Sequence, residues 1–145
     1  MTDKQKNIFN VRVYALIING DSILISKELI RGKEVLKFPG GGLEYGEGLI
    51  EGLQRESMEE MNQTLKNINH FYTTDFFQKC QFDEKNQLIS IYYSAELRSK
   101  LYNKLKKPVK DQPVFIWRKI NEFKDEELEL PIDKHVFKLY KKSQN

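Results

Sequence analysis

The sequence has little of the chemistry that holds secreted or zinc-binding domains together. Among its 145 residues there is one cysteine, Cys80, and there are two histidines, His70 and His135, which lie far apart in the sequence. A lone cysteine forms no internal disulfide, and so few histidines and cysteines argue against a zinc site. We therefore expect a protein of the reducing cytoplasm.

Long hydrophobic runs are also missing. The longest apolar run, from Val13 to Ile18, is far shorter than the ~20 residues that span a bilayer. The first seven residues carry no apolar core of the kind found in secretory signals. We expect neither a membrane partner nor an export signal.

A strong charge of one sign is absent as well. The chain carries 24 Lys and Arg against 21 Asp and Glu, which gives a formal net charge of +3. This balance suits a small anionic ligand and does not favour a nucleic-acid duplex as partner. For the most basic stretch, residues 104–110, a solvated loop is the favoured interpretation, and a patch that binds phosphate is the less favoured alternative.

Length and patterning predict one mixed domain. A chain of this size makes a single domain, which we place at 1–145. Alternating and β-branched segments predict strands over 11–18, 22–26, 35–38, 70–81, 88–97 and 113–120. Polar residues at 28–34 and 83–86 predict a loop and a turn. Helices are expected over 47–61, ended by Asn62, and from Pro131 onward. This order favours the α/β (α+β) class, with a mixed sheet and helices on its faces.

Glycine is concentrated in one short window. Six of the eight glycines lie there: Gly40, Gly41, Gly42, Gly46, Gly48 and Gly52. Glycine serves where backbone must approach another group closely or adopt a positive φ. Because the window leads from a strand into the 47–61 helix, we expect its backbone to approach a metal or a ligand.

The helix that follows carries acids on one face. Glu56, Glu59 and Glu60 are three and four residues apart, so they lie within about one turn of each other. Their mutual repulsion would be relieved by a hard divalent cation such as Mg²⁺, which favours oxygen ligands and often bridges to phosphates. Glutamates on a helix are more often a solvated face, and three glycines more often a turn, so only the combination is informative.

The segment 41–63 resembles the Nudix box. That pattern asks for glycine, arginine and four glutamates at fixed spacings, supplied here by Gly41, Glu47, Arg55, Glu56, Glu59 and Glu60. Only the closing glycine is missing among the seven positions of fixed identity.

Three positions depart from the pattern. Ser57 stands where a bulky aliphatic residue is usual, Asn62 replaces the closing glycine, and Gln63 replaces the final aliphatic residue. Asparagine can serve the closing turn. We expect Ser57 to lose about 1–3 kcal/mol of core packing compared with leucine.

The resemblance implies a fold and an activity. The fold would be a Nudix-type α/β/α sandwich with a mixed sheet between helices. The activity would be Mg²⁺- or Mn²⁺-dependent hydrolysis of a pyrophosphate linkage in a nucleoside diphosphate derivative or a related small molecule. By resemblance, Glu56 and Glu60 are the main metal ligands, Glu59 is a ligand or the base that acts on water, and the carbonyl of Gly40 completes the metal shell.

The resemblance also implies supporting roles. Glu47 and Arg55 would form a structural ion pair that holds the loop against the helix. The box does not fix the general base, which a downstream loop could supply, and Asp83, Glu84 and Glu122 are candidates of equal standing.

Substrate contacts are less well specified. The candidates near the glycine loop and the early strands are Arg12, Lys27, Phe38, Gly41 and Tyr45. Core or loop packing is at least as good an interpretation of the two aromatic residues, and a solvated strand face is the favoured interpretation of the two basic ones.

Two other interpretations stay open. One is a catalytically silent nucleotide-binding or regulatory module on the Nudix fold, although such a loss normally shows as replaced carboxylates. The other is an unrelated α/β domain with an acidic helix face. The residues also leave open whether the chain forms a homodimer.

Overall fold

The computed structural model describes residues 7–144. The prediction that residues 1–7 form no export signal falls almost wholly outside this range. In chain order the elements are β1 (Ile8–Asn19), β2 (Ser22–Ile30), β3 (Lys33–Lys37), β4 (Gly40–Gly42), α1 (Leu49–Met61), β5 (Leu65–Thr73), β6 (Lys79–Cys80), β7 (Asp83–Leu97), β8 (Val114–Lys119), the 3₁₀ turn η2 (Asp125–Glu127) and α2 (Pro131–Ser143).

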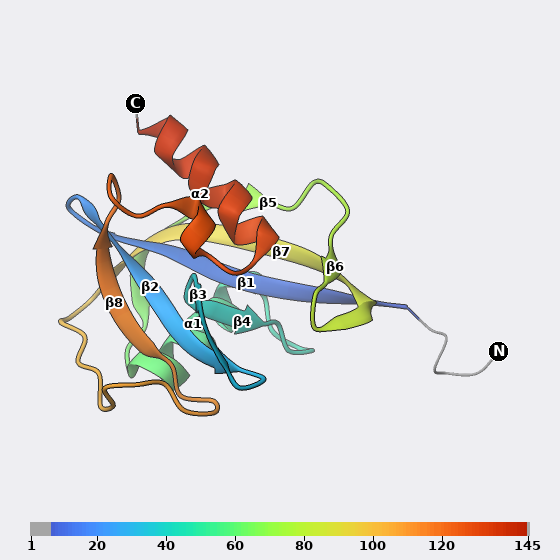
Figure 1. Cartoon of the computed structure of the whole chain (residues 1–145), viewed down its shortest axis with the longest axis horizontal. Helices are drawn as coiled ribbons and strands as arrows, with labels where there is room; N and C mark the ends of the chain where they lie inside the picture. Colours follow the sequence, from blue (N-terminus) through green and yellow to red (C-terminus); the bar gives the residue numbers. More distant parts are fainter. Residues whose placement is uncertain (1–6, 145) are drawn as a thin grey trace.

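The strands form one mixed sheet. Its central order is β3-β2-β1-β7-β5, while β4 pairs with β1, β6 with β7 and β8 with β2. Strands β1 and β7 run parallel from the pair Ile8–Asn86 to the pair Ile17–Ala95, and the other pairings are antiparallel. A parallel pair needs a long connection, and α1 lies within this one. The two long strands pass side by side through the middle of the molecule (Figure 1).

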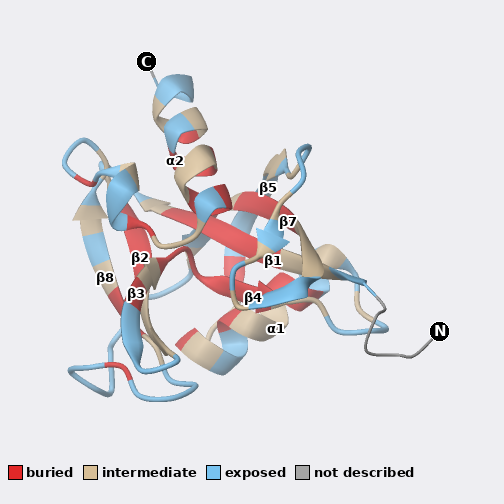
Figure 2. Cartoon of the chain, turned by 45° about the vertical axis from the view of Figure 1, so that its right-hand side comes forward, coloured by how far each residue is buried: buried red, intermediate tan, exposed pale blue. Residues whose placement is uncertain are grey.

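The two helices cover opposite faces of the sheet (Figure 1). Leu16 of β1 packs in one buried cluster with Phe137 of α2, whereas Ala15 and Ile17 pack in a second cluster with Leu53 of α1. Successive strand residues point to opposite faces, so β1 supplies both cores. Figure 2 shows this buried centre between exposed outer surfaces. The predicted α/β/α sandwich with a mixed sheet is confirmed.

The predicted loop at 28–34 is wrong. Strand β2 continues to Ile30 and β3 begins at Lys33, so only Arg31 and Gly32 turn, with φ of 51° and 80°. The hairpin is polar because much of it faces solvent, and this hid its strand character. The turn predicted at 83–86 lies inside β7, and the strand predicted at 70–81 is divided between β5 and β6.

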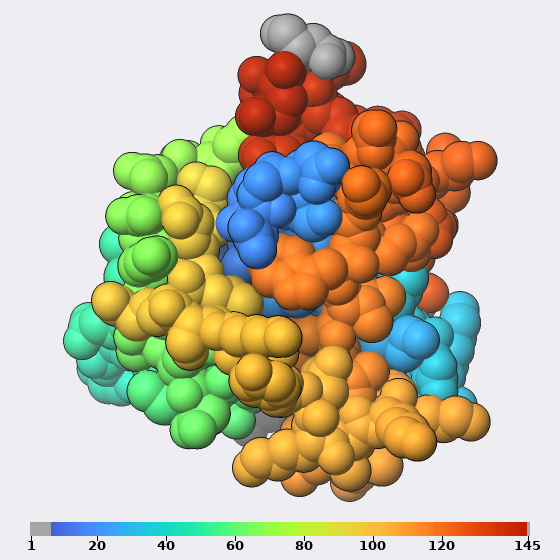
Figure 3. Space-filling view, turned by 90° about the vertical axis from the view of Figure 1, so that its left-hand side faces the viewer, coloured from blue at the N-terminus to red at the C-terminus, as the bar shows by residue number. Residues whose placement is uncertain are grey.

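Residues 98–113 join β7 to β8 by an irregular path. Near its end, Val109 and Gln112 exchange backbone hydrogen bonds of 3.1 and 3.0 Å, which close a tight turn. Figure 3 shows this segment, in gold, across the lower part of one face of the molecule. Over residues 7–144, neither helix has the length and apolar character needed to cross a membrane.

Candidate active site

The glycine window forms β4 and the loop into α1. In β4, Gly41 lies opposite Val13 and Gly40 opposite Tyr14 of β1. Gly40 has a φ of 144°, and a Cβ there would collide with the Val13 carbonyl oxygen. A Cβ on Gly41 would lie 2.6 Å from a carboxylate oxygen of Glu56. Glycine at these two positions therefore lets β4 fit between β1 and the acidic face of α1.

Helix α1 begins and ends close to the predicted residues. Gly48 precedes its first turn, and the Gly48 amide donates to the Glu51 carboxylate over 2.8 Å. At the other end Asn62 adopts φ 57° and ψ 32°, and its amide donates to the Met58 carbonyl over 3.1 Å. The left-handed Asn62 ends the helix as predicted, because asparagine tolerates this conformation.

The residues that depart from the box tie the helix end to its surroundings. The hydroxyl of the buried Ser57 donates to the Gln63 carbonyl over 2.6 Å. The Gln63 side-chain carbonyl accepts from the amides of Arg98 and Ser99 over 2.9 and 3.1 Å. Ser57 thus replaces apolar packing with a satisfied hydrogen bond. Gln63 connects the helix end to the 98–113 segment.

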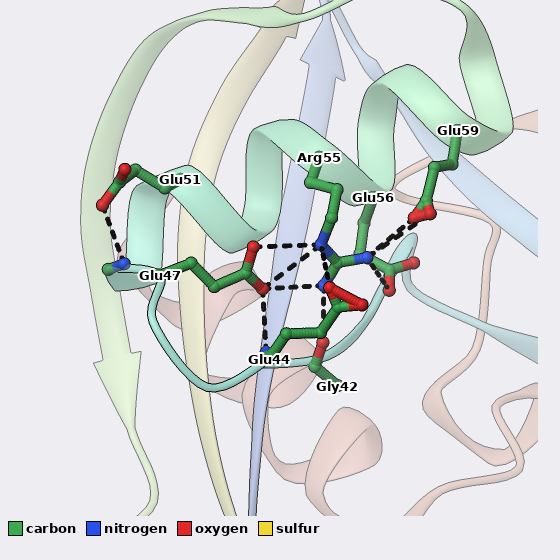
Figure 4. A network of polar contacts seen from close by, with 8 residues as sticks. Gly42, Glu44, Glu47, Glu51, Arg55, Glu56 and Glu59 are labelled. Carbon is green, nitrogen blue, oxygen red and sulfur yellow. Dashed lines mark hydrogen bonds and ion pairs between the residues drawn. The ribbon is translucent and has the colours of Figure 1, made fainter.

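Arg55 holds the loop against the helix (Figure 4). Its guanidinium donates to Glu47 over 2.8 Å from Nη2 and 3.0 Å from Nε, and to the Gly42 carbonyl over 2.9 Å. The Glu44 amide donates to the same Glu47 carboxylate over 2.8 Å. The hydrogen bonds from Arg55, followed by that from Glu44, lower the pKa of Glu47. The structure therefore brings the expected ion pair into contact.

The same guanidinium also reaches the acidic face. Its Nη1 lies 3.2 Å from Glu56 and 2.7 Å from Glu59 (Figure 4). The hydrogen bonds that Arg55 donates to Glu47 first, and then to Glu59 and Glu56, outweigh partial burial and raise the pKa of Arg55. Arg55 thus compensates part of the negative charge on the last two turns of α1.

Glu60 is the acid whose charge is most disfavoured. Burial raises its pKa to about 8, and repulsion by Glu28, Glu56 and Glu59 adds to this, while Lys37 acts in the opposite direction. A cation that enters beside a carboxylate with a raised pKa stabilises its charged form.

Glu28 and Lys37 join the site from the β2–β3 hairpin, and the sequence did not reveal them. Glu28 Oε2 accepts from Lys37 Nζ over 2.9 Å and from the Ser26 hydroxyl over 3.0 Å. Lys37 is 3% exposed. If residues 28–34 are placed in a strand, Ser26 and Glu28 lie on the same face of it, and Glu28 becomes a candidate site residue.

A cavity of about 850 Å³ lies in front of these groups. Its wall is formed by the β2–β3 hairpin, the acidic face of α1 and the 109–113 turn. The charged side chains on it are Glu28, Arg31, Glu44, Arg55, Glu56, Glu59, Glu60, Lys110 and Asp111. A smaller hollow of about 180 Å³ adjoins it and shares Glu59, Glu60 and Asp111.

The carboxylates on the cavity wall suit a hard divalent cation, because all the ligand atoms that they supply are oxygens. Across residues 7–144, however, no three Asp, Glu, His or Cys side chains converge closely enough to hold an ion. Arg55 holds Glu56 and Glu59, and Lys37 holds Glu28. The residues therefore fit Mg²⁺ or Mn²⁺ on condition that carboxylates turn away from these two cations.

The expected substrate contacts are dispersed. Arg12 lies opposite Gly42, and its Nε donates to the Tyr14 hydroxyl over 3.0 Å. Lys27, in the middle of β2, and Tyr45, at an exposed loop, do not line either cavity.

Phe38 requires a correction. Its ring is fully buried, with edge-to-face contacts to Tyr92 at 6.2 Å and Phe137 at 6.1 Å between ring centres. The ring is therefore not open to a ligand, and core packing is what the structure shows for it. Gly41 lies beside the acidic face, so close that a Cβ there would meet the Glu56 carboxylate.

The three general-base candidates from the sequence lie away from the cavity. Asp83 and Glu84 begin β7 beside β6, and Glu122 is in the turn after β8. They do not line the cavity. Asp111 does, at a φ of 63° in the tight turn of the 98–113 segment. The sequence does not single it out, because it follows the basic stretch for which a solvated loop is the favoured interpretation.

Comparison with known proteins agrees with this geometry. The sequence matches the NUDIX domain family model over residues 8–140. Among solved structures, a NUDIX hydrolase from Nitrosomonas europaea is similar, with TM-score 0.74, 23% identity, and coverage of 92% of this chain and 89% of that one. The ORF135 protein of E. coli follows at TM-score 0.73, with 13% identity and coverage of 99% and 96%.

A MutT protein from Methanosarcina mazei Go1 is similar too, with TM-score 0.67, 20% identity, and coverage of 97% and 98%. Curated proteins gave no match. The similar structures show that the chain shares their fold. The match to the family model shows that its sequence also fits the family. With Arg55, Glu56, Glu59 and Glu60 of the box at one cavity and its sequence matched over residues 8–140, the chain belongs to the Nudix family.

Proposed function

We propose that the chain hydrolyses a pyrophosphate linkage in a nucleoside diphosphate derivative or a related small molecule, and that it needs Mg²⁺ or Mn²⁺ to do so. One observation carries this proposal. Carboxylates from four separate segments, namely β2, the loop before α1, α1 itself and the 109–113 turn, line one cavity of about 850 Å³. Such a wall would repel an anionic substrate unless cations entered with it.

The proposed roles are those that the resemblance to the Nudix box implies. The proposed ligands are Glu56 and Glu60 from α1 and the carbonyl of Gly40 from β4, with Glu59 as a further ligand or a base. A bound divalent ion supplies neutralisation of phosphate charge and a lowered pKa for coordinated water. Glu59 would have to leave Arg55 to act as a ligand, while the pairing of Arg55 with Glu47 would keep the loop in position.

Lys110 is our candidate for contact with the substrate's phosphates. It lies on the cavity wall beside Asp111, across from the acidic face of α1. Its ammonium would offset phosphate charge that the metal leaves uncompensated. Arg31 is also on this wall, but its guanidinium is already bound to the Phe82 carbonyl and stacked on the Phe82 ring.

Asp111 is our candidate for the general base. It is the only acidic residue in the 98–113 segment, and that segment brings it to the cavity that Glu56 and Glu60 also line. A carboxylate there could accept the proton of the attacking water.

The test is a panel of nucleoside diphosphate derivatives incubated with the protein, with Mg²⁺ and with EDTA. Released phosphate is measured after phosphatase coupling. We expect hydrolysis of at least one compound, abolished by EDTA. Binding of panel members with no hydrolysis under any metal would favour the silent module instead.

A further inference from the structure

Lys37, at the end of β3, is a buried ammonium group beside the proposed metal site. Its side chain is 3% exposed. Nζ donates to Glu28 over 2.9 Å, to the Phe38 carbonyl over 3.0 Å and to the Gly40 carbonyl over 3.4 Å. All three donors of the ammonium are therefore directed at oxygen.

Core packing alone does not account for this residue. A buried charge is costly unless it is paired and hydrogen-bonded, and a hydrophobic side chain would fill the same space. Nζ lies 5.1 Å from the centre of the Tyr14 ring, which adds a cation–π contact. Burial acts to lower the pKa of Lys37, but attraction by Glu28 and Tyr14 outweighs it and raises that pKa. The positive charge is thus permanent at neutral pH.

Two of its contacts belong to the site already described. Gly40 offers the carbonyl proposed as a metal ligand, and Glu28 lies on the cavity wall. The charge of Lys37 also acts on Glu60. Around the cavity, Glu28, Glu56, Glu59 and Glu60 face the cations Lys37 and Arg55, and the charge of Arg12 also acts on Glu28 and Glu56. Arg55 is partly exposed and can release Glu59, whereas Lys37 is enclosed.

We infer that the buried charge of Lys37, held by Glu28 and by the carbonyls of Phe38 and Gly40, lowers the affinity of the metal-site carboxylates for a divalent cation. This inference rests on the proposed function, because it assumes that the carboxylates bind the ion. A fixed positive charge repels an entering ion, and a low local dielectric strengthens that repulsion. The site therefore accepts its ion most readily when substrate phosphates add negative charge.

The test measures Mn²⁺ binding without substrate, by the electron paramagnetic resonance signal of free Mn²⁺ during a titration. We expect Lys37→Met to bind Mn²⁺ about fivefold more tightly, or more, than the unmodified protein. Lys33→Met is the matched control. Lys33 lies on the same strand, but its side chain is 69% exposed and pairs with Glu129 over 3.1 Å. Its loss should leave the affinity unchanged.

The outcomes separate the two claims. If the unmodified protein binds no Mn²⁺, the proposed function fails and this inference fails with it. If the unmodified protein binds and Lys37→Met binds equally or more weakly, only the inference is overturned. Circular dichroism checks that the variant folds. Should Lys37→Met not fold, Lys37→Gln, which keeps a hydrogen-bond donor without the charge, must show the same tightening, and unchanged affinity there overturns the inference.

Discussion

The backbone of Gly41 lies so close to the carboxylate of Glu56 that a single added methyl group would stand 2.6 Å from its oxygens. A glycine of the loop and an acid of the helix, fifteen residues apart in the sequence, are therefore one structural unit. The loop fixes where the Glu56 oxygens can lie, and the absence of a side chain at Gly41 keeps that place open.

Gly41→Ala should displace Glu56 while the domain still folds. We expect hydrolysis to fall about tenfold or more, because a misplaced ligand loses metal affinity and alignment. Gly42→Ala is the matched control, since a Cβ there would meet only the end of the Arg12 side chain at 3.4 Å. Steady-state assays of both variants test this, and equal activities would show that the close approach has no functional role.

Removing Asp111 should slow the chemical step. Asp111→Asn keeps the shape of the turn but cannot accept a proton, so we expect kcat to fall about 100-fold, within the range of general-base contributions. Glu122→Gln and Asp83→Asn should retain normal rates, because neither residue lines the cavity. A normal pH–rate profile and kcat for Asp111→Asn would leave the base to Glu59.

Glu47 makes stability depend on acidic pH. Its pKa is lowered in the folded protein from an ordinary value of 4.5. Its contribution is therefore present above about pH 4.5, and it is lost as the pH falls through the lowered folded value. The difference in unfolding free energy between the unmodified protein and Glu47→Gln should be larger at pH 7 than at strongly acidic pH. Urea unfolding at both pH values measures it, and a difference independent of pH would contradict the role of the Arg55 pair.

In the absence of metal, Glu60 should make stability depend on pH in the direction opposite to that of Glu47. Its folded pKa is raised to about 8 from 4.5. Its stabilising contribution is complete below about pH 4.5 and is lost as the pH rises towards 8. In EDTA, the midpoint of thermal unfolding should therefore decrease across this range more steeply in the unmodified protein than in Glu60→Gln. Parallel curves would show that Glu60 ionises normally in the folded protein.

Local features of the site could be predicted from the sequence, whereas contacts between distant segments could not. The box helix and its end at Asn62 depend on residues within one segment, which the sequence shows directly, and the pairing of Glu47 with Arg55 is implied by the resemblance to the Nudix box. The contact of Lys37 with Glu28 depends on a hairpin whose polar residues look like a loop. Asp111 reaches the cavity only because an irregular segment folds back beside α1.

Phe38 shows the opposite error. Its position beside the glycine loop suggested a stacking surface, but the covering helix α2 buries its ring. Which face of the sheet α2 covers depends on the whole topology, and one strand end does not show it. Proximity in sequence to a functional loop is therefore a poor guide to exposure.

The central claim is that carboxylates of α1 hold the catalytic metal. It is tested most directly by the Mg²⁺-dependent turnover of Glu56→Gln and Glu60→Gln on a panel compound that the unmodified protein hydrolyses. Glu51→Gln, on the same helix but at its first turn, is the control, because its amide oxygen can still accept from Gly48. We predict that turnover falls about 100-fold or more in each of the two variants, with the fold intact, and stays normal in the control. Near-normal activity in both Glu56→Gln and Glu60→Gln would contradict the account.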